Sequence, residues 1–176
     1  LNMKHKLIKN FLTKEEINIL TDYCRIIHRQ NKTNFDNQNS NGDSSFYGDP
    51  LMESLMLNKR QLVEKHIKLK LLPTYSYFRV YTYQSDLPKH KDRPSCEISV
   101  TVHINSDGTP WEIYVGDKKY ITKPGDAVLY KGCEVDHWRE PFKGDWHAQT
   151  FLHYVNLNGP NKNFYMDQRR MWGDVK

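Results

Sequence analysis

Three side chains in this sequence have the types and spacing of a metal site: His90, Asp92 and His137. His90 and Asp92 stand two residues apart at the expected start of a strand, where alternate residues point to the same face. Two imidazoles and one carboxylate on one side of a metal leave its opposite positions open to small molecules. We therefore predict that His90, Asp92 and His137 form a catalytic metal site.

The context of the His-x-Asp pair matters, because such a pair by itself is more often a surface histidine beside a loop acid. Here a strand-like segment precedes the pair, and His137 follows His90 by 47 residues, just beyond a turn at residues 124–126. The whole pattern favours a metal site. We interpret the other histidines considered as structural or surface residues: His5, His28, His66, His103 and, as a hydrogen-bonded core residue, His153.

Helical patterns fill much of the N-terminal part of the chain. Thr13 and Glu16 form a capping box, in which each side chain accepts a hydrogen bond from the other residue's amide. Apolar residues then recur at helical spacing as far as Ile27. Residues 31–41 are rich in Asn, Gln and Ser and predict an exposed loop. A second helix is expected over residues 50–71, with a buried side formed by Leu51, Leu55, Leu62 and Ile67.

Strand patterns dominate after Pro73, where β-branched and aromatic segments alternate with turn residues. We expect strands at residues 75–83, 97–104, 111–115, 118–122, 127–130 and 146–155. Many short strands separated by turns indicate an antiparallel sandwich or barrel. The predicted fold is α+β and mainly β, a jelly roll carrying the N-terminal helices. We expect one domain over residues 1–176: a helical part (1–72), a core (73–156) and a C-terminal extension (157–176) that docks on the core.

Strand alternation indicates which side chains face the cavity of the jelly roll. One face of the first long strand carries Tyr75, Tyr77, Arg79, Tyr81 and Tyr83, and the other face carries Phe78 and Val80. We expect the apolar face to pack under the helices and the polar face to line the cavity. His147, Gln149 and His153 face inward together by the same argument. Arg93 and Glu97 either meet the substrate or form a salt bridge at the rim.

Composition excludes several classes of protein. The net charge is +5 and the pI about 9.0, but the lysines are dispersed, so nucleic-acid binding is unlikely on this pattern. Three widely separated cysteines make no disulfide framework and suit a reducing cytoplasm. No apolar stretch is long enough to span a membrane, and residues 1–10 are too polar for a signal peptide.

The region 75–155 resembles the double-stranded β-helix, or jelly roll, of iron(II)- and 2-oxoglutarate-dependent oxygenases, particularly their prolyl-hydroxylase-like group. It is most similar to small phage and bacterial members of unknown substrate. The similarity extends through the helices and rests on short motifs, which begin at Tyr47, Pro73, His90, Pro124, His137 and Phe151. The resemblance implies N-terminal helices packed on the major sheet, and the host cytoplasm as the location if a phage encodes the protein.

The resemblance also implies Fe(II) as the metal, 2-oxoglutarate as cosubstrate and O2 as the oxidant. Iron would be bound by His90, Asp92 and His137, and Tyr81 matches the family's cavity tyrosine. The chain departs from the pattern on the last barrel strand, where the family usually has a cation for the distal carboxylate of 2-oxoglutarate. Trp146 and His147 occupy those positions here. The candidates for that carboxylate are therefore His147 and Arg139.

The resemblance implies a hydroxylase with succinate and CO2 as co-products. The leading substrate is a peptidyl, prolyl-like side chain, and another small substrate is the alternative; the partner is then a protein or peptide. Two other classes stay open. One is a cupin-type metalloenzyme, and the other is a non-catalytic, basic nucleic-acid-binding or virion-associated module on the same fold. The pattern leaves the oligomeric state undefined.

Overall fold

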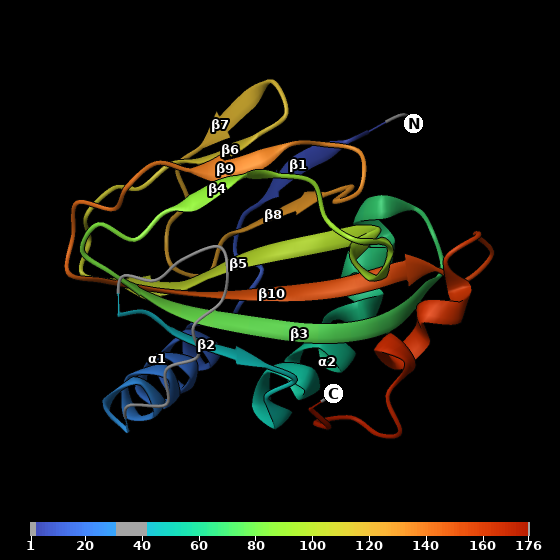
Figure 1. The fold of residues 1–176 in the computed structure, drawn as a ribbon, viewed down its shortest axis with the longest axis horizontal. Helices are drawn as coiled ribbons and strands as arrows, with labels where there is room; N and C mark the ends of the chain where they lie inside the picture. Colours follow the sequence, from blue (N-terminus) through green and yellow to red (C-terminus); the bar gives the residue numbers. More distant parts are fainter. Residues whose placement is uncertain (1–2, 31–41, 176) are drawn as a thin grey trace.

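Two antiparallel sheets face each other, and two helices cover the outer face of the larger one (Figure 1). The computed structural model describes residues 3–30 and 42–175, so the loop expected at residues 31–41 lies outside it. The larger sheet has the strand order β1-β8-β5-β10-β3-β2 and the smaller sheet the order β4-β9-β6-β7. This confirms the predicted jelly roll, mainly β, with N-terminal helices on the major sheet.

The described elements follow one another in this order: β1 (His5–Ile8), α1 (Lys14–Arg29), β2 (Ser44–Tyr47), α2 (Pro50–Ile67), β3 (Leu71–Thr82), β4 (Leu87–His90), η1 (Pro94–Cys96), β5 (Ile98–Ser106), β6 (Ile113–Val115), β7 (Lys118–Tyr120), β8 (Ala127–Tyr130), β9 (His137–Arg139), β10 (Trp146–Asn156) and η2 (Lys162–Gln168). The expected strands are all present, with ends that differ by a few residues.

Both long helices begin at a side-chain cap. In α1 the predicted capping box is present, because the Glu16 amide donates to Oγ1 of Thr13 and the Thr13 amide donates to Oε1 of Glu16. Asp49 caps α2 by accepting from the amides of Leu51 and Met52. These contacts satisfy amides that have no partner within the helix.

The predicted end of the second helix was wrong. We expected a helix over residues 50–71, but α2 ends at Ile67, and Lys68 adopts a left-handed conformation with φ of 62°. The chain then enters β3 at Leu71, before Pro73. Apolar residues around 69–72 fit either a buried helix or a buried strand, and pairing of β3 with β10 decides for the strand.

The two faces of β3 divide as alternation predicts. Phe78 and Val80 are buried in the core beneath the helices, where the rings of Tyr23 and Phe78 lie 6.1 Å apart. Tyr75, Tyr77 and Arg79 line a pocket on the other face. Tyr83 is the exception, because β3 ends at Thr82 and the Tyr83 side chain is 60% exposed.

Two strands occur within the part expected to be helical. β1 pairs with β8, and β2 pairs with β3, so residues from 1–72 form both edges of the larger sheet. The description of residues 1–72 as a helical part was therefore incomplete. Both strands are short and have no alternating pattern of their own, and their pairing with distant strands creates them.

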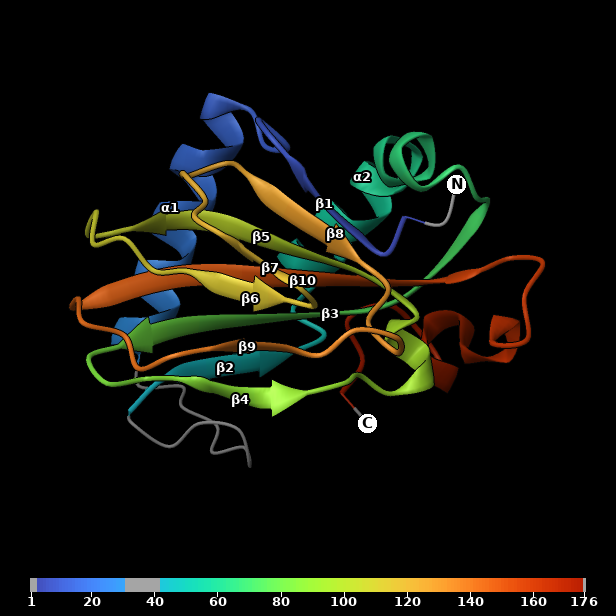
Figure 2. The same cartoon turned by 90° about the horizontal axis from the view of Figure 1, so that it is seen from above.

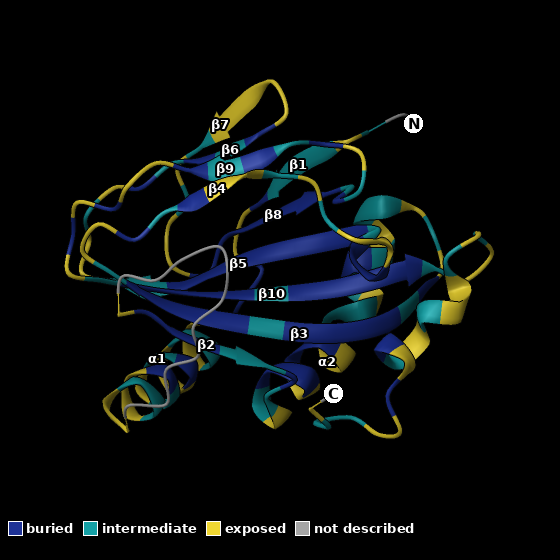
Figure 3. Cartoon of the chain, in the orientation of Figure 1, coloured by how far each residue is buried: buried dark blue, intermediate teal, exposed yellow. Residues whose placement is uncertain are grey.

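The C-terminal extension docks on the core, as predicted. Asp167 is buried and bonds to Arg93 and Tyr47, and Arg169 pairs with buried Glu53 on α2. Figure 2 shows η2 packed beside the end of the sheet at which β10 finishes. In Figure 3 the central strands β5, β10 and β3 are mostly buried, whereas the outer side of α1 is exposed. None of the described helices is long and apolar enough to cross a membrane.

Candidate metal centre and active site

A pocket of about 330 Å³ lies between the two sheets and contains the three predicted metal ligands. His90 is the last residue of β4, and His137 is the first residue of β9, opposite His90 in the antiparallel pair. Asp92 lies two residues beyond the end of β4. The expectation that His90 and Asp92 begin a strand was therefore wrong, since His90 ends β4 and Asp92 follows it.

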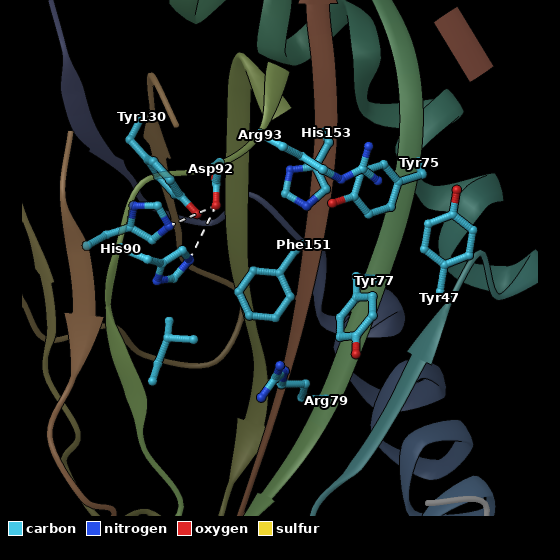
Figure 4. Close-up of a pocket in the computed structure, with 12 residues that line it drawn as sticks. Tyr47, Tyr75, Tyr77, Arg79, His90, Asp92, Arg93, Tyr130, Phe151 and His153 are labelled. Atoms are coloured by element: carbon cyan, nitrogen blue, oxygen red, sulfur yellow. Dashed lines mark ion pairs between the residues drawn. The ribbon is translucent and has the colours of Figure 1, made fainter. Parts of the chain in front are cut away.

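The three side chains converge on one point despite this difference (Figure 4). Oδ1 of Asp92 lies 3.3 Å from Nε2 of His90 and 3.2 Å from Nε2 of His137. One donor atom from each residue lies within 4.8 Å of the others. Two imidazoles and a carboxylate at such separations fit a single metal ion, with its other positions facing the pocket.

Backbone carbonyls orient both imidazoles. Nδ1 of His90 donates to the carbonyl oxygen of Pro88 over 2.7 Å, and Nδ1 of His137 donates to that of Val135 over 3.1 Å. With the proton of each neutral ring on Nδ1, the lone pair of Nε2 points to the shared centre. Such a bond to the outer nitrogen is the usual support of a metal-binding histidine.

The loop after β8 and strand β5 position the carboxylate ligand. The Asp92 amide donates to the carbonyl oxygen of Gly132 over 2.9 Å, and the Ser99 hydroxyl donates to Oδ2 of Asp92 over 3.3 Å. Burial by itself would raise the pKa of Asp92, but its contacts with the imidazoles of His137 and His90 outweigh burial and hold the pKa below its usual range. Asp92 is therefore a carboxylate, and Oδ1 remains available for a metal.

Comparisons with known proteins concern the fold around this site. No family model matches the chain, and no curated protein matches it. Among solved structures, a prolyl-4-hydroxylase of Pseudomonas putida superposes with a TM-score of 0.69 at 17% identity, over 88% of this chain and 94% of the other. The viral collagen prolyl hydroxylase of Paramecium bursaria Chlorella virus-1, in its 2OG complex, gives 0.66 at 12% identity, over 87% and 96%.

A third structure adds bound ligands to the comparison. HygX from Streptomyces hygroscopicus, with nickel and 2-oxoglutarate bound, gives a TM-score of 0.67 at 11% identity, over 88% of this chain and 83% of the other. The chain has the fold of these oxygenases. At such identities the likeness concerns the fold, and the chemistry is argued from the residues of this chain.

The three residues predicted to bind the cosubstrate lie around the Trp111 ring. Tyr81 on β3 lies opposite His147 on β10, and their ring centroids are 6.3 Å apart. Trp111 connects them to Arg139, whose guanidinium lies 4.4 Å from the indole centroid. All three predicted residues are buried, and none lines the pocket that contains the metal ligands.

The wall of the pocket includes residues that the sequence analysis had not assigned to it or had left open. Phe151 and Tyr130 contribute to the lining, and Tyr130 lies with its ring 4.7 Å from that of His137. His153 is a hydrogen-bonded buried residue, as predicted, through its contact with Ser99, and it also lines the pocket. Strand alternation placed His153 on the inward face, as found, and would also have found Phe151, whereas Tyr130 has no such signal.

Arg93 forms a rim salt bridge, but its partner is not Glu97. It donates from Nη1 and Nη2 to the two carboxylate oxygens of Asp167, over 2.7 and 2.8 Å. Glu97 instead accepts from the amide of Asn156. Arg93 also covers the ring of Tyr75 at 4.5 Å, so the C-terminal extension supports one wall of the pocket.

Proposed function

We propose that this protein is an iron(II)- and 2-oxoglutarate-dependent dioxygenase that hydroxylates a peptidyl, prolyl-like side chain or another small substrate. The observation that carries the proposal is the convergence of His90, Asp92 and His137 on one centre, with one side open to the pocket. This donor set, in this fold, suits a metal that must also bind a cosubstrate and dioxygen. The cupin-type alternative has no comparable support, since the described site uses two histidines and one aspartate.

The protein's own residues contribute position and charge. His90 and His137 would present Nε2 lone pairs to the metal, and Asp92 would present Oδ1 and its negative charge. Pro88 and Val135 hold the imidazole orientation through their carbonyls. Bound iron with 2-oxoglutarate and O2 would supply the oxidising chemistry that converts a C–H bond to C–OH, with succinate and CO2 as co-products.

The aromatic lining supports a substrate with an apolar ring. Tyr47 and Tyr75 stack at a centroid distance of 4.9 Å, and Tyr77 and Phe151 face each other at 6.5 Å (Figure 4). Aromatic grooves bind proline-rich segments well, because these segments are already extended before binding. Two of the structures with the same fold are prolyl hydroxylases. We therefore propose a protein or peptide partner. The three free thiols separately support the proposal of a cytoplasmic location, because a reducing compartment keeps thiols free.

The test is succinate release from 2-oxoglutarate by full-length protein that has been loaded with iron without oxygen and then exposed to air. We expect turnover without added substrate, dependence on iron and loss of turnover in His137→Ala. Proline-rich peptides should accelerate it if the substrate proposal is right. Failure of the protein to bind either iron or 2-oxoglutarate would reject the enzyme and favour a non-catalytic module.

A further inference from the structure

Arg139 is a buried cation with an unsatisfied edge. Its residue is 2% exposed, and Nη1 donates to the carbonyl oxygen of Trp111 over 3.0 Å. Nε and Nη2 have no hydrogen-bond partner in the described part of the chain, and no described carboxylate forms an ion pair with this guanidinium. A buried charge without a counter-charge is costly, so its retention indicates a partner that binds from outside the chain.

The free edge has the shape of a carboxylate site. Nε and Nη2 lie along one edge of the planar guanidinium and carry parallel N–H bonds. These two N–H bonds match the two oxygens of a carboxylate. The single ammonium group of a lysine could not make such a paired contact. The Trp111 ring holds the plane in place from one side, at 4.4 Å. The group that fits Arg139 is therefore a carboxylate or a similar planar anion.

The separation of Arg139 from His137 along β9 suits the length of 2-oxoglutarate. Arg139 follows His137 by two residues on β9, so it lies roughly 7 Å further along the same face. A five-carbon diacid has four C–C bonds of about 1.5 Å each, and its terminal carbons are thus roughly 5 Å apart when extended. A 2-oxo acid held at the metal by its first two carbons would reach this depth with its distal carboxylate.

The other candidate for this carboxylate, His147, has its donor occupied. Nε2 of His147 contacts Oε1 of Gln149 over 2.6 Å, while Nε2 of Gln149 donates to the Thr101 hydroxyl over 2.7 Å. Because the amide oxygen can only accept, the proton of a neutral His147 is on Nε2. Nδ1, which has no described partner, then carries a lone pair. This lone pair repels a carboxylate.

The protonation state of His147 leads to the same choice. Burial lowers the pKa of His147 well below its ordinary value, and the nearby His103 and Arg139 lower it further. The two imidazoles stack at a centroid distance of 4.3 Å. His147 is therefore neutral, and the positive charge in this part of the barrel belongs to Arg139.

We propose that Arg139 holds the distal carboxylate of the 2-oxo acid through its Nε and Nη2 atoms, and that it makes the site selective for a diacid. This inference rests on the proposed function. The cation is on β9, beside the metal ligand His137, and not on the last strand, where the resemblance of the sequence to known oxygenases had placed it. Tyr81 and His147 pack on the same Trp111 ring as Arg139 and provide no charge.

Arg79 is the competing cation, because it lines the pocket directly. In Figure 4 Arg79 and Arg93 lie on opposite sides of Phe151. The Arg79 guanidinium already lies over two rings, 5.5 Å from that of Tyr77 and 5.7 Å from that of Tyr81. It also has further contacts within the chain. The test below therefore includes Arg79.

The experiment compares two 2-oxo acids that differ only at the far end. Nickel(II)-loaded full-length protein is titrated by calorimetry with 2-oxoglutarate and with 2-oxopentanoate, which has a methyl group in place of the distal carboxylate. We expect wild type to bind 2-oxoglutarate at least about 100-fold more tightly, since a site built for a polar group rejects an analogue without it. Arg139→Met should lose this preference and keep its affinity for 2-oxopentanoate.

The controls separate the possible failures. Arg60→Met, on the outer surface of α2, should behave as wild type, and Arg139→Lys should keep part of the preference even if Arg139→Met does not fold. An unchanged preference in Arg139→Met would overturn the inference, and loss of preference in Arg79→Met instead would assign the carboxylate to Arg79. Equal binding of both acids by wild type would reject the subsite alone. Binding of neither acid to metal-loaded wild type would reject the proposed function as well.

Discussion

A Cβ atom added to Gly132 would lie 2.4 Å from Oδ2 of Asp92 and 2.4 Å from the carbonyl oxygen of Cys96. The glycine is required for space, because any other residue would place a Cβ atom against these two oxygens. The loop is held this close by a hydrogen bond, since the carbonyl oxygen of Gly132 accepts from the Asp92 amide over 2.9 Å. The loop after β8 therefore approaches the metal carboxylate as closely as backbone can. Position 132 controls where the carboxylate ligand lies, although it is far from Asp92 in sequence.

Substitution of Gly132 should weaken metal binding. We expect Gly132→Ala to displace Asp92 and lower the affinity for iron(II) or nickel(II) by about 10- to 100-fold, the usual cost of disturbing the support of a ligand. Overpacking should also lower the free energy of unfolding by about 1–3 kcal/mol. Metal titration and denaturant unfolding measure the two effects. Gly159→Ala, in a distant turn, is the control, and equal metal affinity in both variants would contradict the close contact.

Removal of any metal ligand should abolish tight metal binding while the fold survives. His90→Ala, Asp92→Ala and His137→Ala should each lose more than about 100-fold in metal affinity, beyond the range for supporting residues. His90 and His137 lie at the ends of short strands, and Asp92 lies just beyond β4. None of the three belongs to the hydrophobic core, so circular dichroism should stay native. His66→Ala on α2 serves as the control. Normal turnover of 2-oxoglutarate by His90→Ala or Asp92→Ala would show that the assignment of ligands is wrong.

The pair of Asp167 and Arg93 should make stability depend on acid pH. Burial tends to raise the pKa of Asp167, but hydrogen bonds from Arg93, Tyr47 and Ser95 outweigh it, so the folded pKa lies below the ordinary value. Such a carboxylate stabilises the fold at pH values above about 3.9, the pKa of an aspartate in the unfolded chain. This contribution is lost as the pH falls from there towards the pKa of Asp167 in the folded protein. Asp167→Asn should therefore be less stable than wild type at neutral pH, by about 1–3 kcal/mol.

Urea unfolding of wild type and Asp167→Asn at neutral pH and near pH 3 measures this effect. The difference in free energy of unfolding should shrink at the lower pH, because Asp167 of the unfolded wild-type chain then binds a proton, which stabilises the unfolded state, and an asparagine cannot do so. Asp145→Asn, in an exposed loop, should match wild type at both values. A difference that is the same at both pH values would show that Asp167 acts through packing and not through its charge.

The pair of Arg169 and Glu53 should hold the C-terminal extension on α2. Their side chains are 1% and 2% exposed, and Nη1 of Arg169 lies 2.6 Å from Oε1 of Glu53. Arg169→Met would leave a buried carboxylate without its counter-charge, which costs about 3–5 kcal/mol. The double variant with Glu53→Gln should cost less than the sum of the single changes, because no lone charge remains.

A neighbouring arginine provides the comparison for this pair. Arg170 contacts Asp174 at 3.3 Å, but its side chain is 83% exposed. Arg170→Met should therefore change the free energy of unfolding by less than about 1 kcal/mol, as expected of a surface pair. Thermal or urea unfolding of Arg170→Met, the two single variants of the buried pair and their double variant checks the order. Similar costs for Arg169→Met and Arg170→Met would mean that the extension is not held by the buried pair.

Local patterns in the sequence predicted several features correctly. The capping box at Thr13 and Glu16 is present, since it depends only on neighbouring residues. Alternation along β3 separates the pocket face from the core face at Tyr77 and Phe78, because side chains of a strand point alternately to its two sides. The residue types at positions 90, 92 and 137 likewise indicated one metal site, which the structure brings together.

Contacts between distant segments decided the rest. The end of α2, strands β1 and β2, and the place of Asp92 beyond β4 depend on which strands pair, and pairing joins residues far apart in the chain. The same holds for Gly132 beside Asp92 and for the unsatisfied edge of Arg139. The sequence by itself determined the local elements and the metal-binding residue types, because periodicity and capping act over a few residues. Only the tertiary structure decided the register, the supporting contacts and the position of the buried charge, because burial and close approach exist only once the two sheets have packed together.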